Sequence, residues 1–155
     1  MIYKVPFVAI SKAVYAVLSD TNNNIGLEWF DSAVPINEIE DYFKSQAEFA
    51  YGIFGAADAD CTPNKTAAVW DSTLQLEIYS NYKGRKVIAQ KLEAVLNYLS
   101  SEDGKSAIQS ALNEEGFALI SMTVNVLRVN LPIYSDNGVW QSGSTIISFR
   151  VSQLN

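Results

Sequence analysis

The sequence predicts an α+β domain, in which a mostly antiparallel β-sheet has helices packed on one face and ends in a long C-terminal β-hairpin. Residues 69–80 alternate between apolar and polar side chains, which is the period of a strand with one buried face. Residues 88–99 carry an apolar stripe at helical spacing. A chain of 155 residues can bury one sizeable core, and we find no internal repeat or linker, so residues 1–155 are predicted to form a single domain.

The N-terminal half predicts one long helix and two short strands. Residues 8–20 place apolar side chains at the spacing of an amphipathic helix. Residues 25–35 alternate in polarity and end at a proline, so they are predicted to form a strand, and residues 49–55 form a second one. Residues 37–46 between them are predicted to form a short helix. Residues 56–68 are small and polar, which is typical of a loop.

The C-terminal half predicts two helices followed by a hairpin. The first helix contains the striped residues 88–99, and a second short helix is predicted over residues 100–116. A long strand over residues 117–132 changes its apolar phase at residues 126–127, which predicts a bulge there. Residues 143–154 alternate again, so the last two strands should pair as an antiparallel hairpin or long β-arm.

The composition is acidic and lacks histidine. The net charge of −6 opposes binding to nucleic acid or to an anionic membrane, which argues against a DNA-coating role. Without histidine the chain lacks the commonest metal ligand and proton shuttle, and the single Cys61 cannot form an internal disulfide. Lys4, Ser11 and Lys12 interrupt the apolar N-terminus, so we expect no membrane segment and no signal peptide. The simplest interpretation is an intracellular protein.

Two short motifs indicate ligand sites only weakly. Asp-Gly-Lys-Ser at 103–106 matches the end of a phosphate-binding P-loop, but Leu99 stands where that motif has its first glycine. From Asp58 the chain follows the start of a calcium-binding loop, but Pro63 and Val69 replace its glycine and its glutamate. No histidine is present to activate a serine or the cysteine. We therefore expect no catalytic residue, no cofactor and no metal site, and hence no enzyme.

The clearest candidate site is a basic turn in this otherwise acidic chain. Lys83, Arg85 and Lys86 lie between the best-defined strand and the best-defined helix. A phosphate-binding loop is one interpretation, although such loops usually need several glycines and this turn has only Gly84. A second interpretation is a plain strand-to-helix joint with solvated or paired charges. In a third, the turn meets an acidic patch on another copy of the chain.

Trp140 is the candidate hydrophobic contact. It follows Ser-Asp-Asn-Gly at 135–138, a sequence that predicts a tight turn within the C-terminal hairpin. Tryptophan is enriched among the residues that anchor protein interfaces. Trp140 is therefore predicted to contact a neighbouring subunit or another partner, together with the three cations of the basic turn.

The strand, turn and helix at 74–99, LQLEIYSNYKGRKVIAQKLEAVLNYL, resemble a hallmark of the bacteriophage tail completion or tail terminator (head-tail joining) protein family. The resemblance continues in the same order along the chain. It includes KAVYAVLSD at 12–20, IGLEWFDSAVP at 25–35, FAYGIFG at 49–55 and NGVWQSGSTIISFRV at 137–151. The chain departs from the family pattern in a longer connection before residue 49 and in a helix at residues 100–116.

The resemblance implies a structural virion protein. Members of the family form a ring, commonly a hexamer, at the head-tail junction, where it terminates or completes the tail and lets genomic DNA pass through the lumen. The implied partners are other copies of the chain and the neighbouring head-completion, connector and tail tube proteins. The implied location is the virion, with assembly in the host cytoplasm. The alternatives are another connector component, such as an adaptor, stopper or tail hub subunit, or a non-viral α+β binding module.

Overall fold

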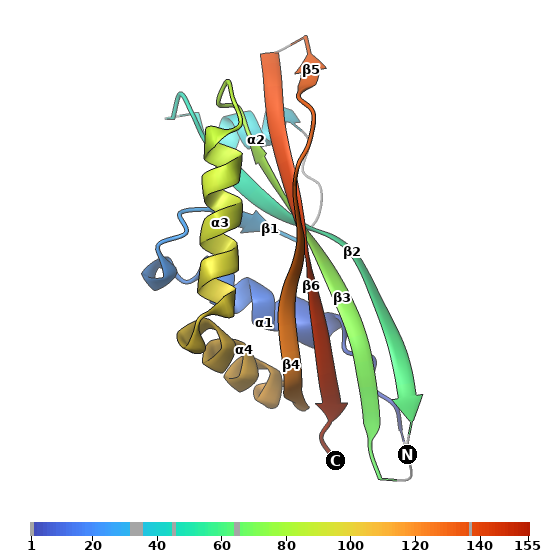
Figure 1. Ribbon diagram of the computed structural model, residues 1–155. Coiled ribbons are helices and arrows are strands. Elements are labelled where there is room, and N and C mark those ends of the chain that lie inside the picture. The colour runs from blue at the N-terminus through green and yellow to red at the C-terminus, as the bar shows by residue number, and fades with distance from the viewer. Residues whose placement is uncertain (1, 32–35, 45, 64–65, 137) are drawn as a thin grey trace.

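A computed structural model describes residues 2–31, 36–44, 46–63, 66–136 and 138–155. Its helices are α1 (Phe7–Ser19), the 3₁₀ turn η1 (Thr21–Asn23), α2 (Ile36–Tyr42), α3 (Lys86–Ser100) and α4 (Glu102–Glu114). Its strands are β1 (Glu28–Phe30), β2 (Ala50–Pro63), β3 (Ala68–Ser80), β4 (Phe117–Val129), β5 (Ile133–Ser135) and β6 (Gly138–Gln153). The fold is α+β, as predicted (Figure 1).

The sheet is built on four long strands. Its order is β1-β2-β3-β6-β4, with the short β5 paired to β6. All of these pairs are antiparallel except β1 with β2, which run parallel. The predicted mostly antiparallel sheet and the predicted C-terminal hairpin, which is β4 paired with β6, are therefore confirmed.

The main core lies between one face of the sheet and the three long helices α1, α3 and α4 (Figure 1). Alternate residues of β3 are buried against these helices, among them Leu74, Leu76 and Ile78. Ile88 and Leu99 of α3 meet them from the helix side and are 0% exposed. Apolar side chains recur every 2 residues on one face of a strand and every 3.6 residues along one stripe of a helix. The strand face and the helix stripes are buried against each other and form this core.

A second, smaller core lies on the opposite face of the sheet at one end. Tyr51 pairs with Tyr79, whose side chain alternates with that of Ile78 and so points away from the main core. Ile39 and Phe43, from α2 and the residue after it, cover this end together with Trp140. The three long helices thus cover much of one face, while α2 covers part of the other.

The segment predicted to be a loop, residues 56–68, is mostly strand. β2 continues to Pro63 and pairs with β3 over its whole length, apart from a register shift between Phe54 and Ala57. The prediction was wrong because Ala, Asp and Cys have low or neutral strand propensity, whereas the ladder to β3 determines the conformation here. Asp58 therefore belongs to a strand, so the calcium-loop interpretation fails.

The Asp-Gly-Lys-Ser motif has a structural role at the joint between α3 and α4. The Ser101 hydroxyl caps α4 by accepting a hydrogen bond of 3.1 Å from the Gly104 amide. A Cβ at Gly104 would collide with the carbonyl oxygen of Tyr98. Only glycine lets the two helices approach this closely, which explains the motif without a phosphate.

Candidate interaction site

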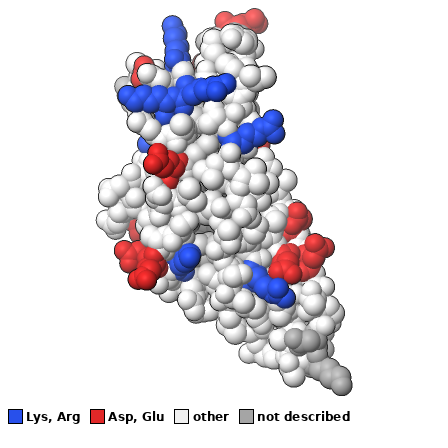
Figure 2. All heavy atoms as spheres, in the orientation of Figure 1, with Lys and Arg blue, Asp and Glu red and all other residues white. Residues whose placement is uncertain are grey.

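The basic turn joins β3 to the start of α3. Gly84 has a φ of 151° and its amide donates to the carbonyl of Tyr82 over 2.9 Å, which closes the turn. Lys83, Arg85 and Lys86 are all exposed. Figure 2 shows basic side chains gathered at the end of the molecule where Figure 1 places this turn. The turn thus presents a compact cationic surface.

The position of these three cations does not stabilise α3, the helix that follows them. The first turn of α3 has no acidic residue and no side-chain cap. The N-terminus of a helix carries partial positive charge, so cations beside it are electrostatically unfavourable. Across the described residues, the ion pairs are Lys12 with Glu115 and Arg150 with Asp71, and neither involves the turn. Ion pairing or helix capping within the described chain therefore does not explain these three cations.

Lys91 is the fourth cation in this part of the sequence, and it has a different role. Its ammonium donates to the carbonyls of Ile25 and Gly26 over 2.7 and 3.2 Å. Burial lowers the pKa of Lys91. Lys91 ties α3 to the segment before β1, so it is not part of the cationic surface.

Trp140 is only 6% exposed and belongs to the second core. Its ring lies 5.6 Å from that of Phe49 and 6.5 Å from that of Tyr51, both edge-on. Trp140 also lines a cavity of about 320 Å³ together with Lys83. The structure thus brings together two of the residues predicted as contacts. The isolated chain leaves little of the indole for a partner, and a contact through Trp140 stays a prediction.

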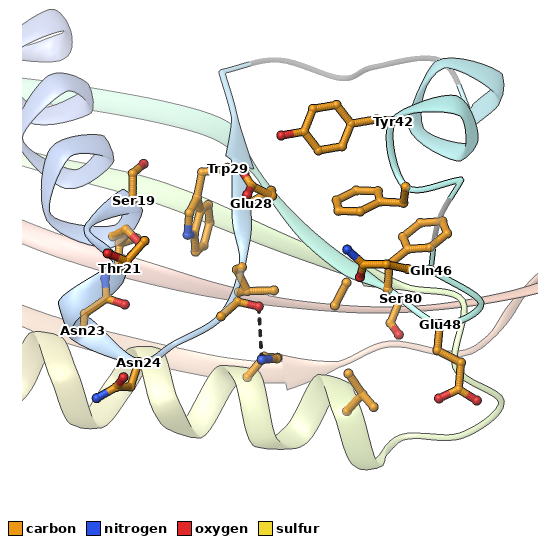
Figure 3. A pocket seen from close by; sticks show the side chains of 18 of the residues that line it. Ser19, Thr21, Asn23, Asn24, Glu28, Trp29, Tyr42, Gln46, Glu48 and Ser80 are labelled. Carbon is orange, nitrogen blue, oxygen red and sulfur yellow. Dashed lines mark hydrogen bonds between the residues drawn. The ribbon is translucent and has the colours of Figure 1, made fainter.

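A larger open cavity of about 950 Å³ lies between the end of α1, η1, β1, the segment after α2 and the start of α3. In Figure 3, Ser19, Thr21 and Asn23 line it from one side and Gln46 and Glu48 from another. No short motif could have revealed this cavity, because its walls come from segments far apart in the sequence.

Charged and hydrogen-bonding side chains line this cavity. The charged lining residues are Asp20, Glu28, Glu48 and Lys91, so the cavity is acidic. The Glu28 carboxylate raises the pKa of Tyr42, which also lines the cavity. A tyrosine held in its protonated form is a hydrogen-bond donor and a poor base.

The described part of the chain holds no cluster of three or more His, Cys, Asp or Glu side chains that could bind a metal ion. Among the helices that the structure describes, none is long and apolar enough to span a membrane.

No protein family model matches this sequence, and no curated protein matches it. Among solved structures, the chain is similar to one in the structure titled "Virion of native gene transfer agent (GTA) particle". The two share 12% sequence identity with a TM-score of 0.51, over 92% of this chain and 93% of the other. At this identity the likeness shows a shared fold, and it extends over nearly the whole length of both chains.

Proposed function

We propose that this chain is a structural virion protein of a phage-like particle. The observation that carries the proposal is the fold, shared along nearly the full length with a chain of a gene transfer agent virion. The resemblance of several sequence segments to the tail completion family leads independently to the same class of protein. The proposed role is structural, and it requires no catalytic group and no cofactor.

More specifically, we propose a ring, hexameric as in the family, at the head-tail junction, where it terminates or completes the tail. Two features support this role. The exposed cations Lys83, Arg85 and Lys86 have no ion-pair partner in the described chain, which suits a contact with an acidic neighbour. The net charge of −6 gives phosphates few counter-charges, which suits a lumen through which DNA passes without binding. The partners would be other copies of the chain and the adjoining connector and tail tube proteins.

The test is deletion of the gene in the cell that produces the particle, followed by electron microscopy. The proposal predicts tails of uncontrolled length and heads without joined tails, and a plasmid copy of the gene should restore normal particles. Normal particles from the deletion strain would contradict the proposal. Heads that leak DNA through an open portal while tails keep their normal length would instead indicate a stopper or adaptor.

A further inference from the structure

Three aspartates gather on the face of the sheet that points away from the main core. Asp60 of β2 lies directly opposite Asp71 of β3 in the strand pairing, and Asp58 lies two residues before Asp60, on the same face. All three residues are exposed and line a hollow of about 280 Å³. We call them the acidic patch. Like charges directly opposite each other on neighbouring strands are destabilising, so this arrangement is unfavourable in the isolated subunit.

Arg150 of β6 offsets only part of the charge of the acidic patch. Its Nε lies 3.7 Å from a carboxylate oxygen of Asp71, and both side chains are about half exposed, so this ion pair is weak. Among the described residues, the carboxylates of Asp58 and Asp60 have no ion pair. Arg128 of β4 pairs with β6 six residues away from Arg150, a separation of roughly 20 Å. With three aspartates and one arginine in its lining, the hollow carries a net charge of −2.

The side chains around the acidic patch leave it accessible. On this face of the sheet, α2 and the second core lie at the other end. The polar uncharged residues that line the hollow are short and hydroxylic: Ser72, Thr73, Ser121, Thr123 and Ser148. A long basic side chain from another molecule can therefore reach the two unpaired carboxylates and donate charge-assisted hydrogen bonds to them.

Several other acidic residues already have a favourable role within the chain. Glu102 and Asp103 lie in the first turn of α4, where the helix dipole stabilises negative charge. Glu115 pairs with Lys12, and the Asp20 carboxylate accepts a hydrogen bond from the Asn22 amide at the start of η1. The acidic patch has no such role, which makes it the better candidate for a cation outside the chain.

The acidic patch and the basic turn lie toward opposite ends of β3. Asp71 is near the start of this strand and the turn follows its last residue, Ser80; nine residues of a strand span roughly 30 Å. In Figure 2 a group of acidic side chains lies on the right below the middle of the molecule, apart from the basic side chains at the upper end. Two exposed surfaces of opposite charge therefore cannot meet within one subunit, but they can meet between two copies.

We propose that the basic turn of one copy docks on the acidic patch of the next copy, in a head-to-tail contact. Such a contact joins two different surfaces, and it closes into a ring when the rotation between copies allows closure. Complementary charge selects the partner and fixes how it is oriented. The inference rests on the proposed function, which it deepens by naming the surfaces through which copies of the chain join. It can nevertheless fail while the virion role stands.

The test exchanges the charges of the two surfaces. Arg85→Glu with Lys86→Glu gives an acidic turn, and Asp58→Lys with Asp60→Lys gives a basic patch. A fourfold variant carries both changes. All four positions are exposed, so the fold should tolerate the substitutions. Sedimentation velocity and light scattering give the masses, and circular dichroism checks the fold.

Two further variants control for charge and for folding. Glu93→Lys with Glu114→Lys makes the same change of charge as the basic patch at exposed helical positions outside both surfaces. Asp58→Asn with Asp60→Asn removes the two charges with a smaller change of side chain, and it replaces the lysine variant if circular dichroism shows that one unfolded.

Wild type and the Glu93→Lys, Glu114→Lys control should assemble beyond the monomer as concentration rises, and less so at high salt, because salt screens exposed charges. The acidic-turn variant and the basic-patch variant should each associate at least about tenfold more weakly. An equimolar mixture of these two variants should associate more tightly than either alone, because every turn again meets a patch of opposite charge. The fourfold variant should do the same by itself.

Two results would overturn the contact. In the first, the single-surface variants assemble like wild type, or neither the mixture nor the fourfold variant associates more tightly than they do. In the second, Glu28→Lys with Glu48→Lys, in the acidic cavity beside the basic turn, rescues the acidic-turn variant and the basic patch does not. The turns would then meet between like ends of two copies. A monomeric wild type that is still recovered in particles would also overturn this contact, and it would leave the virion role intact.

Discussion

β3 and β4 flank the same strand, β6, but they are built differently. β3 pairs with β6 residue for residue from Val69 to Ser80 without a register shift. β4 shifts its register at two places, and each shift places an exposed apolar residue, Ile120 or Val126, in the gap. β3 has neighbours on both sides, whereas β4 is an edge strand.

This difference in pairing regularity indicates a different role for each strand. A central strand is constrained by both neighbours and by the core, so regular alternation gives the lowest free energy. An edge strand can be bent by bulges, which change where its side chains point and protect it from unspecific pairing. β3 therefore serves the fold, and we propose that β4 and the segment after it serve assembly.

The largest effect is expected on the β3 side of this comparison. Leu76 is 0% exposed in the middle of the main core. Leu76→Ala should lower the free energy of unfolding by about 2–5 kcal/mol, through lost burial and the cavity that remains. Urea unfolding measures the change. A loss of less than about 1 kcal/mol would show that the helices do not close tightly over β3.

A change at the β4 bulge should separate stability from assembly. Val126→Gly relieves a φ of 41° and removes the exposed side chain, so the subunit should be up to about 1 kcal/mol more stable while assembly weakens. Val129→Gly is the comparison variant: no positive φ is relieved there and Val129 packs against the main core, so this change should destabilise the subunit. Thermal unfolding and sedimentation report the two quantities. A less stable Val126→Gly variant would contradict the assignment of strain to this residue.

Charge reversal in the basic turn should also weaken assembly without lowering the stability of the subunit. Arg85→Glu with Lys86→Glu places acidic residues at the start of α3, where each is worth about 0.3–1 kcal/mol in favour of the helix at low ionic strength. We therefore expect unchanged or slightly higher stability, together with weaker ring assembly or weaker joining to the particle. Lys105→Glu, at an exposed cation on α4, is the charge control. If the double variant assembles normally, the turn is a plain joint.

The smallest effect is a change in pH dependence next to the second core. Burial, followed by the hydrogen bond to Glu77, raises the pKa of Tyr79 to about 12 from its ordinary 10.0. The folded chain holds this proton more tightly than the unfolded chain, so stability is retained below pH 10 and lost as pH rises toward 12.

Tyr79→Phe removes this part of the pH dependence. The variant should lose less stability than wild type over the same alkaline range, although Tyr51, whose pKa burial also raises, keeps part of the effect. Urea unfolding at several alkaline pH values tests this expectation. Equal losses in the two proteins would show that Tyr79 titrates normally.

The sequence predicts the main core well because buried apolar residues recur along the chain at the regular spacing of a strand or a helix. Leu74, Leu76 and Ile78 alternate in β3, and the apolar stripe of α3 repeats as a helix requires. The phase change at Val126 likewise reveals the bulge, since one extra residue moves the apolar positions to the other face. The second bulge, at Ile120, was not predicted.

The features that the sequence did not predict depend on tertiary contacts between segments that are distant in the sequence. The second half of β2 is a strand because β3 lies beside it, and its small residues give no signal of their own. Trp140 is covered because the segment after α2 folds back over it, which depends on tertiary packing. The basic turn was found from charge alone, because three neighbouring cations in an acidic chain are visible without any tertiary contact.

The position of this chain in purified particles decides whether it is a structural part of a virion. Particles would be labelled with gold-conjugated antibody against an epitope tag placed after Asn155, because Leu154 beside it is exposed. Our account predicts label at the junction of head and tail in intact particles and no label in particles from untagged cells. Particles that carry no label, with the tagged protein recovered only in the soluble lysate, would contradict it.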